Sequence, residues 1–471
     1  MTRSQFESAS SSSPVRIRAR TWAAMMLLPP LAISACASTG SSMGVGGGPG
    51  SSGASGAGGI AGVGGIAGAS GGGSGGATGG GSGAIGGAPG AGGMTATGGA
   101  AGVTGAGGSA AGGSTGSCPV IGDFQTWPTG KGPADIGKLA VTDFKGHTGD
   151  VYGGAGYALA FSWFGALRFT KLTGDTANNQ TLITAFEPYA SGTITVDNSA
   201  TATVDSRAFG DLPLEIFQQN MDARDKTLGL ARADMQWAST SANGITSDAR
   251  YWADDMYMIT GLQVEAYRVT KDTKYLNRMT TTMLAYFTAL QQPGGLFWHT
   301  MTSKAYWGRA NGWVAAGMAE LLLELPAGAT RDMIMTAFKA EIDGLLPLQI
   351  NGGTDDGMWR QVLDLASAPA ESSCTAMFTF ALTTAVKNGW LTDAKYSAAA
   401  RKGWLAVANK TNSAGKLDKI CPGTGAAPAG TLASQQQFYA TIALGLGDLH
   451  GQAPLMWSAH ALLRNDCPGV R

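Results

Sequence analysis

The chain lacks the sequence features of common metal, nucleotide and nucleic-acid sites. It contains no Cys-x-x-Cys and no His-Glu-x-x-His, the spacings that hold zinc in many proteins. Lys plus Arg and Asp plus Glu number 32 each, and this zero formal charge predicts no basic surface for nucleic acid. We therefore expect no metal, no cofactor and no nucleic-acid partner.

A long internal segment lacks charge and bulk. Residues 37–117 contain no Asp, Glu, Lys or Arg, and almost no aromatic or large apolar side chain. Gly, Ser, Ala and Thr make up most of the segment, which includes no phosphate-binding sequence ending in Gly-Lys-Ser or Gly-Lys-Thr. Such a segment cannot bury enough apolar surface to offset the entropy of ordering it. It is predicted to be a disordered, flexible linker.

The first 36 residues have the pattern of an export signal. Three arginines between residues 16 and 20 precede an apolar run over residues 22–35, which is too short to span a bilayer comfortably. The run ends in Ile-Ser-Ala-Cys, which resembles a bacterial lipobox with Cys36 as the lipidated residue. The alternative is an ordinary secretory signal cleaved near Ala35. Both predict an exported protein, and the first predicts contact with a membrane only through a lipid anchor at the cell envelope.

Beyond the linker there are few cysteines. The four that remain are Cys118, Cys374, Cys421 and Cys467. An even number in an exported protein permits disulfides, with three possible connectivities. Cys118 and Cys467 lie at the two ends of residues 118–471 and are one candidate pair, while buried free thiols are the alternative.

Residues 118–471 are long enough for one large core and are predicted to be helical. Apolar residues recur at helical spacing in 157–172 and 256–269, and strand-like alternation is scarce, with 192–196 the best candidate. Further helices are expected over 314–325, 331–349, 375–388, 393–409 and 454–463.

Turn signals recur along this part of the chain. Asp175, Asp225 and Asp272 follow helical segments at similar spacing, which indicates a repeat of about 50 residues built from two helices. Six such hairpins fit the length. The sequence thus predicts an all-α domain of six helical hairpins, arranged as a closed ring or an open solenoid, and we expect a monomer.

Candidate carbohydrate-binding residues gather near predicted helix junctions. Five tryptophans lie there beside glycines and polar groups: Trp252, Trp298, Trp307, Trp313 and Trp359. Aromatic rings stack on the C–H faces of sugars, although burial in the core is the alternative use of a tryptophan. His299, one of only four histidines, follows an aromatic run, and the guanidinium of Arg309 could hold an anionic sugar.

Asp254 and Asp255 stand side by side at the start of an apolar helix. One carboxylate suffices to cap a helix, so the second is a candidate for a pocket. The apolar neighbours of Asp254 would desolvate it and raise its pKa, as a general acid requires.

Five segments together resemble the glycoside hydrolase family 88/105 group, the unsaturated glucuronyl and rhamnogalacturonyl hydrolases. They are Trp252–Met258, Gly295–His299, Trp307–Trp313, Asp356–Gln361 and Glu371–Thr375. The resemblance covers residues 204–463 and implies an (α/α)6 barrel. It implies an enzyme without metal or cofactor that hydrates the 4,5-double bond of a terminal unsaturated uronic acid.

The same resemblance implies a substrate and site residues. The expected activity is unsaturated rhamnogalacturonyl hydrolase, acting on lyase-generated pectin oligosaccharides. Alternatives are a glucuronyl hydrolase acting on glycosaminoglycan-type fragments, and a non-catalytic glycan-binding surface lipoprotein. Asp254 matches the acid/base that protonates C4 and helps water add at C5. Asp205 is placed as the second acidic residue, with Asp197 as its rival. The expected substrate-binding residues are Arg250, Trp252, Met258, His299, Trp307, Arg309, Asn311, Trp313 and His450. Residues 434–446 fit the family pattern poorly.

Overall fold

The computed structural model describes residues 121–150 and 156–465. The predicted signal peptide, the lipidation site at Cys36, the linker over residues 37–117 and the cysteines Cys118 and Cys467 lie outside the described residues. Within them, helices dominate, and two short strands, β1 (Trp359–Arg360) and β2 (Ala370–Glu371), pair antiparallel. The prediction of an all-helical fold is therefore confirmed for this part of the chain. The predicted strand at 192–196 is wrong, because these residues form turns and loop.

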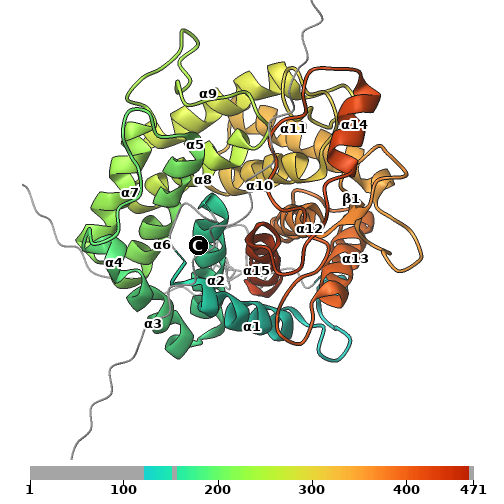
Figure 1. Cartoon of the computed structure of the whole chain (residues 1–471), viewed down its shortest axis with the longest axis horizontal. Coiled ribbons are helices and arrows are strands. Elements are labelled where there is room, and N and C mark those ends of the chain that lie inside the picture. Colours follow the sequence, from blue (N-terminus) through green and yellow to red (C-terminus); the bar gives the residue numbers. More distant parts are fainter. Residues whose placement is uncertain (1–120, 151–155, 466–471) are drawn as a thin grey trace, which may run out of the picture. The chain divides into compact units, whose positions relative to one another are not determined.

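Six inner helices form a closed ring. They are α2 (Gly156–Thr173), α6 (Asp211–Asn220), α8 (Asp255–Thr270), α10 (Gly308–Glu324), α12 (Ser372–Lys387) and α15 (Leu449–Leu463). Each packs against the next along the chain, and α15 returns to α2 (Figure 1). This closing contact between the last and the first inner helix decides for the ring and against the open solenoid.

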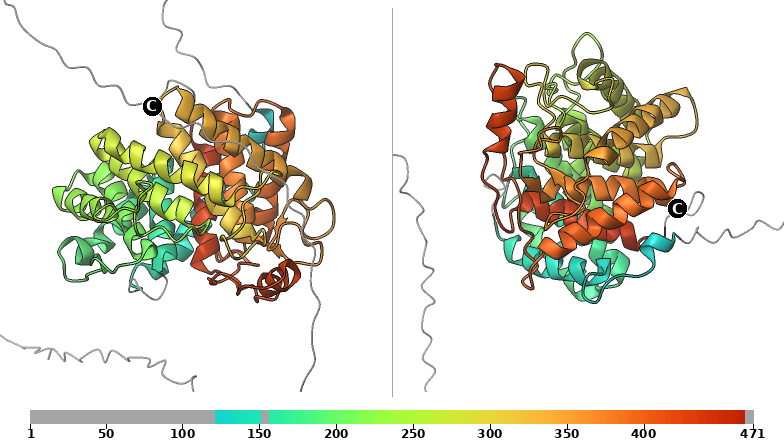
Figure 2. Two further views of the ribbon diagram at one scale, coloured as in Figure 1. Left: turned by 90° about the horizontal axis from the view of Figure 1, so that it is seen from above. Right: turned by 90° about the vertical axis from the view of Figure 1, so that its right-hand side faces the viewer.

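Outer helices alternate with the inner ones. They are α1 (Pro133–Phe144), α3 (Thr176–Ala185), α7 (Ala223–Met235), α9 (Thr273–Leu290), α11 (Ala329–Leu345) and α13 (Ala394–Lys410). Each contacts an inner helix next to it in sequence, as Figures 1 and 2 show from three directions. The predicted aspartate turns mark the start of the outer helices: Asp175 caps α3, Asp272 caps α9 and Asp225 lies in the first turn of α7.

Two inner helices begin earlier than the sequence predicts. α10 starts at Gly308 instead of residue 314, and α15 starts at Leu449 instead of residue 454, with Pro454 inside the helix. Arg309 and His450 precede the predicted helix starts but lie in the first turns of these helices. An inner helix therefore carries functional side chains on a rigid element at its N-terminal end.

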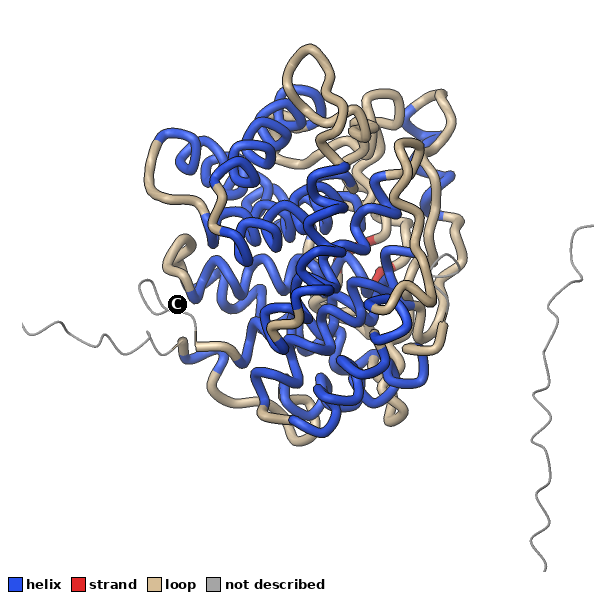
Figure 3. The backbone as a smooth tube through the Cα atoms, turned by 90° about the vertical axis from the view of Figure 1, so that its left-hand side faces the viewer, coloured by secondary structure: helices blue, strands red, loops and turns tan. Residues whose placement is uncertain are grey.

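Short elements and loops complete the described fold. The helices α4 (Glu187–Ala190), α5 (Val204–Arg207) and α14 (Leu432–Ala440) lie between the hairpins, as do the 3-10 turns η1 (Gly122–Phe124), η2 (Lys145–His147), η3 (Ala208–Gly210) and η4 (Leu346–Leu348). Figure 3 shows long loops beside the two short strands. None of the described helices is long and apolar enough to cross a membrane. Of these elements, α5 and α14 bring side chains to the site described next.

Candidate active site

The predicted site residues gather where inner helices begin. Tyr157 lies in the first turn of α2, Asp254 directly precedes α8, and Arg309 and His450 lie in the first turns of α10 and α15. The N-terminal end of a helix carries a partial positive charge, so several such ends together favour an anionic ligand. The site is therefore suited to bind a negatively charged molecule.

Asp254 and His299, two predicted site residues, are in direct contact. Nε2 of His299 lies 3.0 Å from Oδ2 of Asp254, although the ring N–H points off the line to that oxygen. His299 is fully buried and Asp254 is 7% exposed. The backbone also joins the two segments, because the amide of Ala253 donates to the carbonyl of His299 at 2.8 Å. The loop of His299 is thus fixed to the start of α8.

The pKa of Asp254 corrects one prediction. Burial raises this pKa, as the sequence suggested, but the contact with His299 and the charges of Arg250 and Arg309 outweigh burial. The pKa of Asp254 consequently falls below its ordinary value of 3.8. Without ligand, Asp254 is an ionised carboxylate in a cationic surrounding, not the neutral acid expected from its apolar neighbours.

Arg250 binds two further carboxylates, those of Asp205 and Asp255. Its Nη1 and Nη2 donate to the two oxygens of Asp205 at 2.8 and 2.9 Å, and its Nε and Nη2 donate to Asp255 at 2.9 and 2.7 Å. The guanidinium also lies 4.7 Å from the ring centroid of Trp252. This brings Asp205 to the site. Its rival Asp197 is exposed and accepts a hydrogen bond from the amide of Ser199, within its own turn.

Asp255 positions the segment that leads into α8. It is fully buried and accepts from the backbone amide of Arg250 and from the hydroxyl of Tyr286, both at 2.7 Å. Burial raises its pKa, and Arg250 and Tyr286 partly offset that rise. Tyr251, which follows Arg250 in this segment, has a φ of 55°, a backbone conformation that non-glycine residues rarely adopt. Asp255 therefore holds a strained turn in place, so that Asp254 alone of the pair is directed to His299.

Arg309 is held by the chain itself. It is nearly fully buried, its Nη1 donates to the carbonyl of Cys421 and its Nη2 to that of Pro422 at 3.4 Å. Its Nε has no partner among the described residues, and its guanidinium lies 4.6 Å from the ring centroid of Trp307. Glu371, which caps α12, accepts from the amide of Cys421 at 2.9 Å and so fixes the segment that binds Arg309. Arg309 contributes positive charge near Asp254. Of its guanidinium nitrogens, Nε remains available to a ligand.

Two predicted substrate contacts are corrected. Asn311 uses its whole side chain on the backbone: Oδ1 accepts from the amide of Phe297, and Nδ2 donates to the carbonyls of Phe297 and Trp307. It supports the loop of His299 instead of facing a ligand. Met258 is fully buried in the core on α8.

Most of the tryptophans that were predicted to stack on sugars are also buried. Trp307 and Trp313 are each 1% exposed, with Trp307 packed on His299 and Trp313 on Tyr257. Trp252, in contrast, remains partly exposed. Of Trp252, Trp307 and Trp313, it is therefore the one that a ligand can reach without moving another side chain.

Residues that sequence reasoning did not select complete the site. The hydroxyl of Tyr157 lies 3.1 Å from Nε2 of His450, whose Nδ1 lies 2.7 Å from Oδ1 of Asp448. Burial raises the pKa of Tyr157, and Arg309 and Asp254 both act on it electrostatically. Burial and the charge of Arg309 lower the pKa of His450, so this histidine is neutral. Tyr157 stood at the start of a predicted helix with no polar neighbour in sequence to mark it.

The cysteine thiols of the described residues are free. Cys374 and Cys421 are buried free thiols, and burial raises the pKa of Cys421 to about 12. Within residues 121–150 and 156–465, no three or more His, Cys, Asp and Glu side chains converge as metal ligands.

Comparison with known proteins decides the family. Residues 145–465 match the model of Glycosyl Hydrolase Family 88. The chain belongs to glycosyl hydrolase family 88. Its relatives include an unsaturated 3S-rhamnoglycuronyl hydrolase from Alteromonas sp., 30% identical over 41% of this chain and 49% of the relative. Another is an unsaturated rhamnogalacturonyl hydrolase from Bacillus subtilis, 26% identical over 37% of this chain and 50% of the relative. The chain thus spans about half the length of these curated relatives.

Solved structures share the fold of this family 88 chain. A possible GH105 member from Salmonella enterica has a TM-score of 0.62 at 19% identity, covering 72% of this chain and 97% of that one. A family 88 protein from Bacteroides vulgatus has a TM-score of 0.57 at 18% identity, covering 70% and 99%. At these identities the likeness concerns the fold alone.

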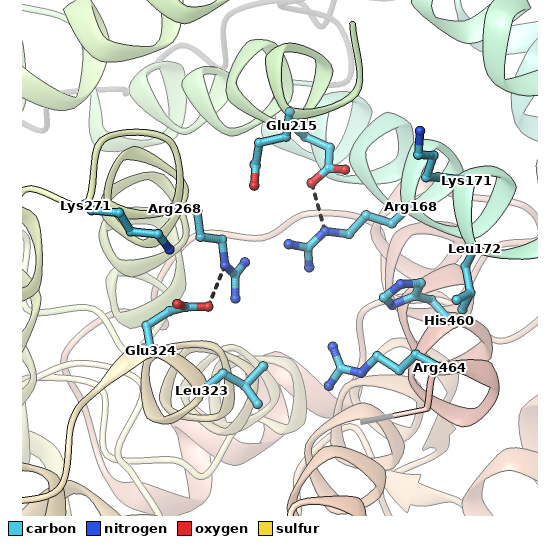
Figure 4. Close-up of a pocket in the computed structure, with 11 residues that line it drawn as sticks. Arg168, Lys171, Leu172, Glu215, Arg268, Lys271, Leu323, Glu324, His460 and Arg464 are labelled. Atoms are coloured by element: carbon cyan, nitrogen blue, oxygen red, sulfur yellow. Dashed lines mark hydrogen bonds and ion pairs between the residues drawn. The ribbon is translucent and has the colours of Figure 1, made fainter. Parts of the chain in front are cut away.

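A cavity at the other end of the family 88 ring has a different character. Its volume is about 700 Å³, and its lining includes Arg168, Arg268 and Arg464 near the C-terminal ends of inner helices (Figure 4). Arg168 and Arg268 pair with buried glutamates, among them Glu265, to which both donate. Cations at helix C-terminal ends offset the negative end of the helix dipole. This cavity contains none of the residues around Asp254, and we assign it a structural role.

The two carboxylates bound to Arg250 are predicted to differ in their effect on stability. Asp255→Asn would place an amide among donors that need an acceptor in a fully buried site, and should lower the free energy of unfolding by about 3 kcal/mol. Asp205→Asn, at a half-exposed carboxylate, should lower it by less than about 1 kcal/mol. Urea unfolding of both variants measures the difference. Equal losses would contradict the positioning role of Asp255.

Proposed function

We propose that this family 88 chain is an unsaturated uronyl hydrolase, with Asp254 as its catalytic acid/base. The observation that carries the proposal is the buried Asp254 carboxylate beside His299, within the fields of Arg250 and Arg309. Asp205 gives both oxygens to Arg250, which leaves one carboxylate of this cluster for chemistry. Glycosidases that attack the anomeric carbon use two carboxyl groups on opposite sides of the bond. A single acid/base suits addition of water to a double bond better.

The reaction proceeds through protonation and hydration. Protonated Asp254 donates its proton to C4 of the C4=C5 bond, and the ring oxygen stabilises the positive charge that forms at C5. Water then adds to C5 and returns a proton to the Asp254 carboxylate, so the residue is regenerated. The resulting C5 hemiketal opens the ring, and the linkage at C1, now a hemiacetal, releases the partner sugar. The net change is addition of one water molecule.

The cationic surrounding explains how Asp254 could become an acid when substrate binds. The uronic acid carries a carboxylate, which is attracted to the helix N-terminal ends, to Arg250 and to the Nε of Arg309. A negative charge placed there disfavours a second negative charge nearby and raises the pKa of Asp254. Bound substrate would thus supply the protonated form that the empty site disfavours.

For the substrate, we propose a 4,5-unsaturated uronic acid linked to rhamnose, with pectin-derived rhamnogalacturonan fragments first. Elimination across C4 and C5 removes the C4 stereocentre, so glucuronic and galacturonic acid yield the same unsaturated residue. Selectivity between substrates must then come from contacts with the partner sugar. The names of the relatives from Alteromonas sp., Formosa agariphila and Bacillus subtilis all combine rhamnose with a uronyl group. The two relatives named rhamnoglycuronyl hydrolase favour a rhamnose–glucuronyl fragment as the second candidate.

The cellular setting is part of the same proposal. The predicted export signal over residues 1–36 and the cysteine at position 36 support an enzyme held at the cell envelope by a lipid anchor. Residues 37–117 would then act as the tether between anchor and enzyme.

A substrate panel tests the proposed specificity. Unsaturated uronyl disaccharides with rhamnose, sulfated rhamnose or hexosamine as the partner sugar are incubated with the full chain. Loss of the ultraviolet absorbance of the conjugated double bond measures turnover. We expect the highest kcat/KM on a rhamnose-linked substrate. A preference for the hexosamine-linked substrate would overturn the assignment and favour a glycosaminoglycan-type fragment.

Replacing the proposed acid/base should abolish turnover. Asp254→Asn keeps the size of the side chain but cannot donate the proton, so kcat should fall at least about 100-fold. Asp197→Asn, at the exposed rival carboxylate, is the matched control and should keep full activity. Turnover by Asp254→Asn at the rate of the unsubstituted protein would show that another group is the acid.

The pH dependence follows from the lowered pKa of Asp254. Activity needs the protonated form, whose fraction falls as pH rises above the pKa. In the free enzyme, kcat/KM should therefore decline about tenfold per pH unit above the lowered pKa. Bound uronate raises this pKa, so the decline of kcat should lie at higher pH. A kcat/KM that rises with pH through the acidic range would contradict the assignment of Asp254 as the acid.

A further inference from the structure

The hydroxyl of Tyr439 lies where three segments of the chain meet. Its oxygen is 2.5 Å from Nδ1 of His299, 2.9 Å from Oγ of Ser303 and 2.7 Å from the backbone amide of Ala427. Tyr439 belongs to α14, inside the segment 434–446 that fits the family pattern poorly, and it is fully buried. A buried phenol with three polar neighbours has a hydrogen-bonding pattern that can be worked out donor by donor.

Only one arrangement of these hydrogens gives the hydroxyls of both Tyr439 and Ser303 an acceptor. The amide of Ala427 can only donate, so it occupies one acceptor position of the Tyr439 oxygen. If Tyr439 donates to Nδ1 of His299, Ser303 donates to Tyr439, and both hydroxyls have an acceptor. If instead Nδ1 carried a proton and donated, Tyr439 would donate to Ser303. The buried Ser303 hydroxyl would then have no acceptor among its described partners, which is unfavourable for a buried donor.

We propose that Tyr439 is a positioning residue that fixes His299 in the neutral tautomer with its hydrogen on Nε2. In that tautomer Nδ1 accepts from Tyr439, and the hydrogen is on Nε2, which lies 3.0 Å from Oδ2 of Asp254. The kinetic consequence rests on the proposed function, since it concerns Asp254 as the acid/base. The tautomer itself does not depend on that function.

The packing around the imidazole supports this role. Trp252 and Trp307 pack against His299 with ring centroids at 5.3 and 4.9 Å. These aromatic contacts leave Tyr439 and Asp254 as the polar partners of the two ring nitrogens. The hydroxyl of Tyr439 is thus the group that decides which nitrogen of the resting histidine bears the hydrogen.

Removing this hydroxyl should leave the local fold in place. The ring of Tyr439 stacks on Trp307 with centroids 5.5 Å apart, and the side chain of Gln361 donates to the Tyr439 carbonyl at 2.5 Å. The side chain of Gln435 also joins α14 to the loop of Thr302. None of these contacts uses the hydroxyl, so Tyr439→Phe isolates its effect.

Nitrogen-15 NMR of the resting protein tests the tautomer directly. The chain has four histidines, and His299→Gln identifies the His299 signals by their loss. We expect His299 to show a protonated Nε2 and an unprotonated Nδ1 at neutral pH, and Tyr439→Phe to give a mixture of tautomers. A doubly protonated His299, a hydrogen on Nδ1 alone, or an unchanged tautomer in Tyr439→Phe would overturn the proposal.

Kinetics of the same variant test the consequence for catalysis. Tyr439→Phe should lower kcat about 10- to 100-fold with little change in KM, because the group that orients the acid/base is no longer fixed. Tyr396→Phe is the matched control, since it removes a tyrosine hydrogen bond to Asp343 between two outer helices. Unchanged kcat in Tyr439→Phe would overturn the positioning role. A chain that turns over no unsaturated uronide would refute the proposed function, while the NMR result would still stand.

Discussion

The contact between Asp254 and His299 is the interaction on which the account depends. It joins the start of an inner helix to a loop that returns from an outer helix, and both side chains are buried. Burial alone would make Asp254 a neutral acid, yet His299 and two arginines reverse the direction of the pKa shift. The site is thereby prepared for an anion, and its acid form depends on what binds there.

The ring explains why such a cluster can exist. Inner helices present their N-terminal ends together, so side chains far apart in sequence, such as Tyr157, Arg309 and His450, meet at one end. Positive helix ends and arginines reinforce each other there. The opposite end collects arginines and glutamates in paired networks, which satisfies the C-terminal ends without leaving an obvious reactive carboxylate.

Much of the helical framework could be predicted from the sequence, because helical periodicity and aspartate turns are local signals. The turns at Asp175 and Asp272 mark real starts of outer helices. The role of Tyr439 could not be predicted, because it lies 140 residues from His299 in the sequence and no local sequence pattern indicates the contact. The predicted direction of the pKa shift of Asp254 was wrong, since its apolar neighbours are adjacent in sequence while His299 and Arg309, which lower the pKa, are not.

Asn311 shows the same limit of sequence-based prediction, here for a residue that the sequence did select. Its place in a dense polar–aromatic segment favoured contact with a ligand, but only the fold shows that the backbone of Phe297 and Trp307 occupies its side chain. Composition and spacing therefore located the region of the site. Which side chains face a ligand and which support the loops depended on tertiary contacts.

The most direct test is a crystal structure of Asp254→Asn with an unsaturated uronyl–rhamnose disaccharide bound. The account predicts C4 of the uronyl ring about 3–3.5 Å from the side chain at position 254. It also predicts the sugar carboxylate toward Arg250 and Arg309. A bound sugar that presents C1 to position 254, with C4 turned away, would contradict it.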